Sequence, residues 1–257
     1  MRTFLVLLTI VLATPVIGLA VIIASLLGIP DRPGSLFDRA PRLWGSLLVR
    51  AGGVRVVVHD AARMQTGEPR VYAANHVSWF DVFVLASTLR RYKFIAKAEL
   101  ERIPLFGAAV RAAGFIFIDR SNRTAAFAGY EAAAARMRRG FSVVVYPEGT
   151  RGTNYALRPF KKGPFVLAIA AGAPVVPTLL YGTREVSPNG SFAVTSATVH
   201  VHFLEPVPTE GLTYGDRDRV ARLAFDRMAA ALEQHYGVCC ASPPSEAESL
   251  EAEPAPA

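Results

Sequence analysis

The first pattern in the chain is an uncharged apolar run close to its beginning. The run covers residues 4–29 and contains no Asp, Glu, Lys or Arg. As a helix it would be roughly 39 Å long at about 1.5 Å per residue, whereas a bilayer's hydrocarbon core is about 30 Å thick. We therefore expect a membrane-anchoring helix, in which Pro15 and Gly18 allow a kink or a division into two half-helices.

The residues that flank this run bear on how it meets a membrane. A signal peptide is the alternative, but its apolar core is usually about 7–15 residues long, which is shorter than this run. Arg2 precedes the run and four arginines follow it by Arg50, a bias that places the following domain on the cytoplasmic side. A monotopic or re-entrant anchor fits as well as a spanning helix. Residues 36–52 mix apolar and Arg positions and predict a second, interfacial amphipathic helix.

Beyond residue 52 the pattern changes to short apolar runs that alternate with helical periodicity. This alternation predicts an α/β fold, with a mostly parallel central sheet flanked by helices and an N-terminal membrane-anchoring helical segment. The last predicted helix has Leu223 and Met228 on its apolar face. The expected strands are 54–59, 70–74, 93–96, 115–118, 142–146, 175–181 and 197–204, and the expected helices are 80–90, 104–113, 123–139, 163–171 and 216–236.

Charge and composition divide the chain into three parts. We expect an anchor at 1–52, a folded domain at 53–240 and a disordered acidic tail at 241–257. The net charge is +7, and the tail holds four Glu and no base, so the remainder carries +11. Next to an apolar anchor, this excess favours attraction to anionic lipid headgroups. The chain lacks a nucleic-acid recognition motif, and we expect no nucleic-acid partner.

One loop after a predicted strand carries an imidazole close to a carboxylate. The run NHVSWFD (75–81) places His76 directly after an apolar strand and Asp81 five residues later. Ser78 followed by Asp81 at the third position is typical of a capping box at a helix start. A chain that turns at Ser78 can bring Asp81 onto one ring nitrogen of His76 and leave the other as a base. A surface capping interaction is the structural alternative for this pair.

Cationic side chains and a tight turn follow three other predicted strands. Taken one at a time they have ordinary explanations: a solvated lysine, an ion pair at a strand end and a connecting loop. Together they suit a phosphate-binding set, because Arg and Lys clamp phosphate and the N–H groups of a turn can hold anionic oxygen. A nearby His could then remove a proton from a hydroxyl group. The residues are Lys97, Arg120 and, in YPEGTR (146–151), Glu148, Gly149, Thr150 and Arg151.

The other histidines give no recognisable metal motif. The chain has no HExxH sequence and no paired-carboxylate cluster, so we expect no metal. His200 and His202 alternate on a predicted strand and share one face, but no third ligand is evident. We interpret them as solvent-facing strand residues. His59 and His235 have no supporting neighbours in the sequence.

Four ordered blocks carry a resemblance to a known family. They are NHVSWFD (75–81), GFIFIDR (114–120), YPEGTR (146–151) and GAPVVPT (172–178). The first fits an N-H-x4-D pattern, and the third has Tyr146 where Phe is commoner. Each block alone is weak, but four in this order over roughly 50–210 are specific. In these blocks the chain resembles the glycerolipid acyltransferases, specifically the 1-acyl-sn-glycerol-3-phosphate acyltransferases.

The resemblance implies a function and a role for each site residue. It implies transfer of a fatty acyl group from acyl-CoA or acyl carrier protein to the sn-2 hydroxyl of 1-acyl-sn-glycerol-3-phosphate, giving phosphatidic acid. The donor is a co-substrate and no cofactor is expected. The protein would sit in a bilayer, at the inner membrane of a bacterium, with its catalytic domain facing the cytoplasm. His76 would be the general base and Asp81 its orienter; Lys97, Arg120 and Arg151 would bind the acceptor phosphate, and Glu148, Gly149 and Thr150 would shape the acceptor site.

Three alternatives remain open from the sequence. The same chemistry could serve another lysolipid acceptor, such as lyso-ornithine lipid. A non-catalytic membrane-surface lipid-binding protein would need the basic charge but not an intact His76–Asp81 pair. A lipid hydrolase could use the same histidine and would release free fatty acid. The choice of donor and the acyl-chain length have no readable signature.

Overall fold

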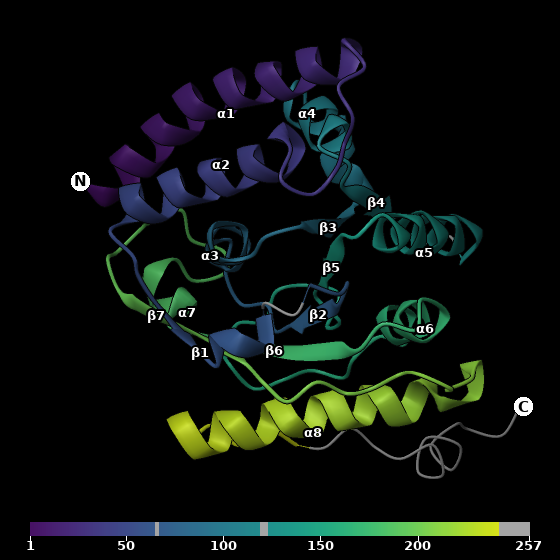
Figure 1. Ribbon diagram of the computed structural model, residues 1–257. Helices are drawn as coiled ribbons and strands as arrows, with labels where there is room; N and C mark the ends of the chain where they lie inside the picture. The colour runs from purple at the N-terminus through teal and green to yellow at the C-terminus, as the bar shows by residue number, and fades with distance from the viewer. Residues whose placement is uncertain (65–66, 119–122, 242–257) are drawn as a thin grey trace, which may run out of the picture.

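The computed structural model describes residues 1–64, 67–118 and 123–241, so residues 242–257 of the predicted tail lie outside the described part. Seven strands form one sheet in the order β1-β7-β6-β2-β5-β3-β4 (Figure 1). Five of the six pairings are parallel and the β6–β7 pairing is antiparallel, which confirms the expected mostly parallel α/β sheet. The strands are β1 (Arg55–His59), β2 (Val71–Ala74), β3 (Tyr92–Lys97), β4 (Ile116–Ile118), β5 (Ser142–Val145), β6 (Val175–Tyr181) and β7 (Thr198–Phe203).

Helices cover both faces of this sheet. One face packs against α3 (Phe80–Thr88), which lies beneath α2 (Leu36–Gly52). The other face packs against α5 (Arg123–Arg138), α6 (Gly163–Ala170) and α8 (Arg217–Tyr236). The remaining helices are α1 (Arg2–Leu26), α4 (Phe106–Ala112), the short α7 (Thr183–Val186), and 3₁₀ turns at Ala61–Met64, Ala98–Arg102 and Tyr214–Asp216.

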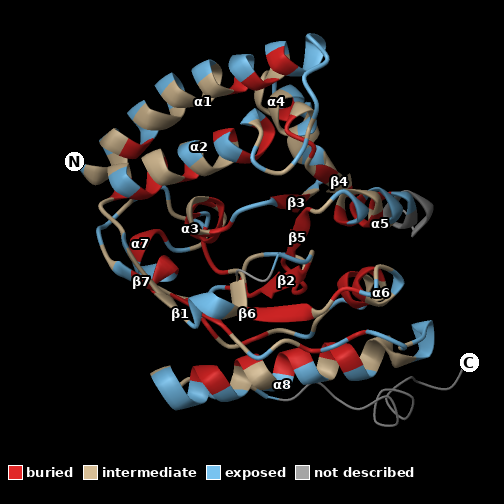
Figure 2. Ribbon diagram, viewed as in Figure 1, coloured by how far each residue is buried: buried red, intermediate tan, exposed pale blue. Residues whose placement is uncertain are grey.

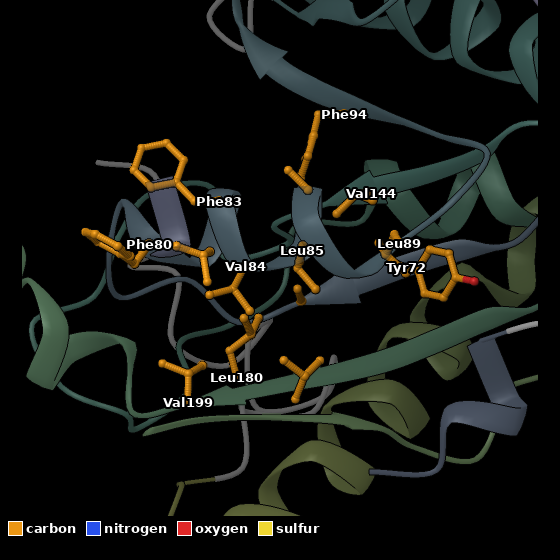
Figure 3. Packing of buried hydrophobic residues seen from close by; sticks show 14 of the residues in the cluster. Tyr72, Phe80, Phe83, Val84, Leu85, Leu89, Phe94, Val144, Leu180 and Val199 are labelled. Atoms are coloured by element: carbon orange, nitrogen blue, oxygen red, sulfur yellow. The ribbon is translucent and has the colours of Figure 1, made fainter. Parts of the chain in front are cut away.

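The central strands are buried on both sides, which explains their continuous apolar runs. All four residues of β5 and of β2 are buried. On the α3 side, Phe83 and Leu85 pack toward Phe94, Val144 and Leu180 of the sheet (Figure 3). On the other side, α8 buries Phe225 and Met228 and leaves Leu223 41% exposed. The predicted α8 face is therefore wrong at Leu223, because the helix turns Phe225 toward the sheet instead.

Helix α1 packs on the domain along α2 and α4 and does not project away from it (Figure 1). It is continuous through Pro15, so of the two possibilities left open at Pro15 and Gly18 the division into half-helices does not occur. It is long and apolar enough to cross a membrane, with a mean hydropathy of 2.8, and 17% of its most apolar window is buried. Its outward side is largely exposed (Figure 2), and the exposed large apolar residues of the helix include Val11 and Val16.

Helix α2 uses its apolar face for packing inside the protein. Phe37, Leu48 and Val49 are buried, and the helix contacts both α1 and α3. Gly45 permits the close approach to α3, because a Cβ at this position would lie 2.8 Å from the Ala86 Cβ. The predicted amphipathic helix is thus present, but much of its apolar face meets α3 and α1.

An ion-pair cluster fixes the linker between α1 and α2 to the sheet. Asp31 accepts a hydrogen bond of 2.9 Å from Lys93 Nζ and one of 3.2 Å from Arg136. Lys93 has no exposed side-chain area, and burial lowers the pKa of its ammonium group while Asp31 opposes that shift. Lys93 also donates to the carbonyl oxygen of Ala113 at 2.6 Å. Through these contacts the buried ammonium group holds the linker between α1 and α2 against the sheet.

Candidate active site

The predicted site residues gather where three neighbouring parallel strands end. His76 follows β2, Tyr146 follows β5, and Lys97 is the last residue of β3. Because β2, β5 and β3 are adjacent and parallel, their carboxyl ends share one edge of the sheet. In α/β sheets ligands bind at such an edge. The topology therefore brings together the segments at His76, Lys97 and Tyr146, which are 21 to 70 positions apart by their numbering.

His76 and Asp81 form a hydrogen-bonded pair. The distance between His76 Nδ1 and Asp81 Oδ2 is 2.8 Å. The carboxylate has no exposed side-chain area and the imidazole is 15% exposed, so the ring alone reaches solvent. With Nδ1 donating to Asp81, the second nitrogen, Nε2, is left as the acceptor. This is the arrangement of a general base held in one tautomer by a carboxylate.

Asp81 also organises the loop that carries His76. Its Oδ2 accepts the backbone N–H groups of Val77 at 2.7 Å and Ser78 at 2.8 Å. Ser78 Oγ accepts the N–H of Phe80 at 3.1 Å and not that of Asp81, and the N-cap of α3 is Trp79, so only one of the two bonds of the predicted capping box is present. The Ser78 hydroxyl donates to the carbonyl oxygen of Ser187 at 2.6 Å, which gives it a structural role. Capping and orientation of His76 are thus performed by the same carboxylate oxygen.

Tyr146 forms one wall of the His76 site. Its ring is stacked on the imidazole with the ring centroids 4.0 Å apart and the planes 17° apart. Burial raises the pKa of the Tyr146 hydroxyl well above its usual value, and Asp81 raises it further. The phenol therefore stays neutral and contributes a flat apolar surface that fixes the ring of His76.

Glu148 ties the two catalytic loops together. Its Oε1 accepts the backbone N–H of His76 at 2.9 Å, and its Oε2 accepts the N–H and Nε–H of Arg158 at 3.3 Å. Gly152 completes the link by donating its N–H to the His76 carbonyl oxygen at 2.7 Å. Burial raises the pKa of the Glu148 carboxyl, and these donors oppose the shift. Its observed contacts are with the protein itself, and they position His76.

The YPEGTR turn presents Arg151 over an aromatic ring. Gly149 has φ 84°, in the left-handed region that favours glycine, and its N–H donates to the Tyr146 carbonyl oxygen at 3.1 Å. The Arg151 guanidinium carbon lies 4.5 Å from the centroid of Trp79. Burial lowers the pKa of Arg151 while Asp81 raises it, and the guanidinium stays charged at neutral pH. Thr150 is exposed beside it.

The other predicted cations differ in position. Lys97 is exposed at the end of β3 and lines the same pocket as His76 and Arg151. Arg120 lies outside the described residues. Lys162, which follows the YPEGTR loop, forms an ion pair of 2.8 Å with Asp218 near the start of α8.

A pocket of about 360 Å³ opens beside His76. The solvent-accessible polar part of its lining, formed by His76, Lys97, Thr150 and Arg151, is here called the mouth, and most of the remaining lining is apolar. The interior walls come from α1, α2, α3, α4, β3 and the segments around them, and they include Thr14, Ile17, Trp44, Phe83, Phe94, Ala109 and Phe115. A mostly apolar pocket lined also by a base and two cations is suited to a ligand with an acyl chain and an anionic head.

Several contributing residues were not predicted from the sequence. Asn75 is buried and makes paired hydrogen bonds with Leu180 of β6, at 2.9 and 2.7 Å, which lock the His76 loop to the sheet. Trp79 contacts Arg151, and Arg158 donates a hydrogen bond to Glu148. Asn75 and Trp79 belong to the NHVSWFD run itself, so its composition was a usable indication. The contact of Arg158 with Glu148 depends on a ten-residue loop and left no local pattern.

Comparison with known proteins agrees with this geometry. The family model described as Acyltransferase matches residues 55–181, a span that contains all of the predicted site residues. The 1-acyl-sn-glycerol-3-phosphate acyltransferase of Limnanthes douglasii is 31% identical over 197 residues, which are 76% of this chain and 68% of that protein. The chain belongs to the acyltransferase family.

Other relatives of this acyltransferase-family chain carry related names. Human 1-acyl-sn-glycerol-3-phosphate acyltransferase beta is 38% identical over 166 residues, which are 64% of this chain and 60% of the human protein. The chain thus spans less than two thirds of that relative's length. The crystal structure of the 1-acyl-sn-glycerophosphate (LPA) acyltransferase of Thermotoga maritima superposes with a TM-score of 0.72 at 24% identity, covering 92% of this chain and 99% of that one. The two chains share a fold.

Proposed function

We propose that this protein transfers a fatty acyl group from acyl-CoA or acyl carrier protein to the sn-2 hydroxyl of 1-acyl-sn-glycerol-3-phosphate, giving phosphatidic acid. The observation that carries the proposal is the His76–Asp81 pair at the mouth of an apolar pocket, beside Lys97 and Arg151. The names of the relatives support the same activity. The pair provides a base, the pocket takes an acyl chain, and the cations attract a phosphate.

The reaction needs one proton to be removed and later returned. His76 Nε2 takes the proton from the sn-2 hydroxyl as that oxygen attacks the thioester carbonyl carbon. The tetrahedral intermediate then collapses, the carbon–sulfur bond breaks, and His76 returns the proton to the departing thiolate. Asp81 holds the ring and stabilises the imidazolium between these two steps. This sequence uses no cofactor and no covalent enzyme intermediate.

The cations and the turn give the acceptor its orientation. Arg151 presents a charged fork that can hold a phosphate through two N–H groups, and its stacking on Trp79 restricts the fork's rotation. Lys97 lines the same pocket from the end of β3. Glu148 acts through the His76 loop, Gly149 allows the turn, and Thr150 offers a hydroxyl at the mouth. Arg120 is proposed as a third phosphate ligand from its place in the second sequence block alone.

We also propose that the protein is embedded in one leaflet through α1, from the cytoplasmic side of a bacterial inner membrane. The outward face of α1 is apolar and exposed, and its inner face packs on α2 and α4. A helix docked laterally in this way suits an interfacial position better than an isolated span. The acceptor and product are lipids, so this position would bring the pocket to the bilayer surface.

Liposome flotation tests the membrane arrangement. Leu12 is 59% exposed on α1, and Leu223 is 41% exposed on α8. Leu12→Glu should reduce the fraction that floats with anionic vesicles, because a charge on the embedded face must be desolvated. Leu223→Glu makes the same chemical change on the opposite side of the domain and should float normally. Equal flotation of both variants would remove the support for α1 as the embedded face.

An acyl-transfer assay tests the function. Purified protein receives 1-acyl-sn-glycerol-3-phosphate or lyso-ornithine lipid, each with acyl-CoA or acyl carrier protein. We expect phosphatidic acid, and a loss of turnover of about 10²–10³-fold in His76→Ala. His235→Ala, on α8, serves as the histidine control. Acylation of lyso-ornithine lipid alone would replace the acceptor, whereas release of free fatty acid without an acylated product would indicate a hydrolase. A fully active His76→Ala enzyme would refute the mechanism.

A further inference from the structure

Four of the five histidines of the chain gather on the sheet face opposite to the His76 pocket. His59 ends β1, His200 and His202 alternate on β7, and His235 lies in the last turn of α8. The intervening residues Val199, Val201 and Phe203 of β7 pack on the α3 side, so the β7 histidines face α8. Their grouping has no part in the proposed acyl transfer. His200 and His202 also lie beyond the residues that the family model matches.

Strand register is what assembles this cluster. β1 and β7 pair in parallel with Val57 opposite His200 and His59 opposite His202. Residues on the same face of two neighbouring strands are close, so His59 meets both β7 histidines. The His59 Nε2 and His200 Nδ1 atoms are 3.0 Å apart. The rings of His59 and His202 are stacked with their centroids 4.1 Å apart.

This arrangement corrects two interpretations made from the sequence. His202 is 4% exposed, so it is buried and not solvent-facing. His59, which had no neighbours in the sequence, supplies the third imidazole that His200 and His202 lacked. One ring nitrogen from each of the three residues lies within 4.8 Å of the other two.

We propose that His59, His200 and His202 bind a divalent transition-metal ion, with Zn²⁺ as the best match. A tetrahedral site with metal–nitrogen bonds of 2.0–2.1 Å separates its nitrogen ligands by about 3.4 Å. The His59–His200 pair is already near this separation, and rotation of a ring moves a nitrogen by about 1 Å or more. Three imidazoles without a carboxylate favour Zn²⁺, Cu²⁺ or Ni²⁺ over Mg²⁺ and Ca²⁺.

The surroundings of the cluster fit a ligand set. The Tyr236 hydroxyl lies 2.7 Å from His202 Nε2 and would orient that ring, as outer partners of metal-bound histidines do. Asp60, directly after β1, faces the cluster and forms an ion pair of 3.6 Å with Arg63. From α8 the cluster is faced by His235, whose ring centroid is 4.8 Å from that of His202.

The bound ion would act as a structural clip. β1 is the edge strand of the sheet, held on one side by β7 alone. A metal shared by His59 and two β7 residues would cross-link the edge strand to its neighbour, and binding to the folded state alone raises its stability. The ion lies across the sheet from His76, so removal of the ion should leave acyl transfer unchanged at temperatures where the protein is folded.

Cobalt titration tests the site directly. Tag-free, full-length protein in detergent is treated with a chelator, dialysed and titrated with Co²⁺, whose visible absorption reports tetrahedral nitrogen coordination. We expect saturation at one equivalent, displacement of the band by Zn²⁺, and a higher unfolding temperature with Zn²⁺. His59→Gln and His200→Gln should weaken binding at least tenfold, since each removes a ligand but leaves a half-buried polar side chain.

His235→Gln is the matched control, because it removes a histidine from the same surface but not from the ligand group. It should retain the cobalt band. Absence of a stoichiometric band in the wild-type protein, or a band that survives in a folded His59→Gln variant, would overturn the proposal. Loss of the band in His235→Gln would overturn the three-residue ligand set. Circular dichroism and thermal unfolding confirm that each variant is folded before it is scored.

Discussion

Replacing Asp81 by asparagine isolates the charge of the carboxylate from its shape. The Oδ2 atom accepts three N–H groups, from His76 Nδ1, Val77 and Ser78, at 2.7–2.8 Å. The Oδ1 atom is buried and has no hydrogen-bond partner among the described residues. An asparagine can therefore keep its oxygen on the three donors and place its amide nitrogen where Oδ1 lies. The loop geometry should survive while the negative charge beside His76 disappears.

The size of the effect follows from the charge separation. In the transition state His76 becomes an imidazolium, with its charge about 4 Å from the carboxylate. At an effective dielectric constant of about 20, this pair is worth about 4 kcal/mol. Since about 1.4 kcal/mol corresponds to a tenfold change in rate, we expect kcat to fall by about 10²–10³-fold in Asp81→Asn. The KM for the acceptor should change little, because Asp81 is buried behind His76. The unpaired amide N–H should reduce stability by about 1–3 kcal/mol.

Initial rates with 1-acyl-sn-glycerol-3-phosphate and a saturating donor give kcat and KM, and urea unfolding gives the stability. Asp226→Asn, at an exposed position of α8, provides the same chemical change away from the site. A folded Asp81→Asn enzyme with kcat within about threefold of wild type would refute the electrostatic reasoning. A large rise in acceptor KM at unchanged kcat would contradict the assignment of Asp81 to His76.

Three further changes probe the pocket, the phosphate site and the anchor joint. Arg151→Lys should raise the acceptor KM about tenfold or more at similar kcat, as measured by initial rates. A lysine cannot bind the acceptor phosphate through two N–H groups, and it stacks less well on Trp79. Ala109→Phe should shift donor preference in a competition assay toward shorter acyl chains, since Ala109 lines the pocket interior, whereas Ala108→Phe at an exposed position should not. Asp31→Ala should lower the unfolding free energy by about 3–5 kcal/mol, because the buried Lys93 ammonium group loses its carboxylate partner. Adding Lys93→Met should restore most of the lost unfolding free energy. A double variant that is no more stable than Asp31→Ala would contradict this cause.

The contact between His76 and Asp81 could be predicted from the sequence because it is local. His76 and Asp81 are five residues apart, and the capping pattern around Ser78 fixes the turn that joins them. The strand-end position of Lys97 and the tight turn at Gly149 were likewise readable, since each depends on a few neighbouring residues. The parallel sheet then follows from alternating strands and helices, and it places these loops at one edge.

Contacts that depend on strand register or helix docking were not readable. His59 and His202 are 143 positions apart by their numbering, and a shift of one residue between β1 and β7 would turn His59 to the other face. The α8 prediction failed at Leu223 for a related reason. Helical periodicity is compatible with burial of either of two adjacent faces, and docking on the sheet buries the face that carries Phe225. The partnership of Asp31 and Lys93 also lacks a local pattern, as 62 residues separate them.

The docking of α1 connects this apolar helix to the proposed active site. Thr14, Ile17 and Val21 of α1 line the same pocket as His76, so the helix is a wall of the proposed acyl site. The linker that follows α1 also carries Asp31, the partner of the buried Lys93. Removal of the first 31 residues would therefore open the pocket to water. It would also leave the buried Lys93 ammonium group without its Asp31 partner. Helix α1 and the proposed active site therefore form one structural unit, since the apolar helix supplies part of the pocket that His76 lines.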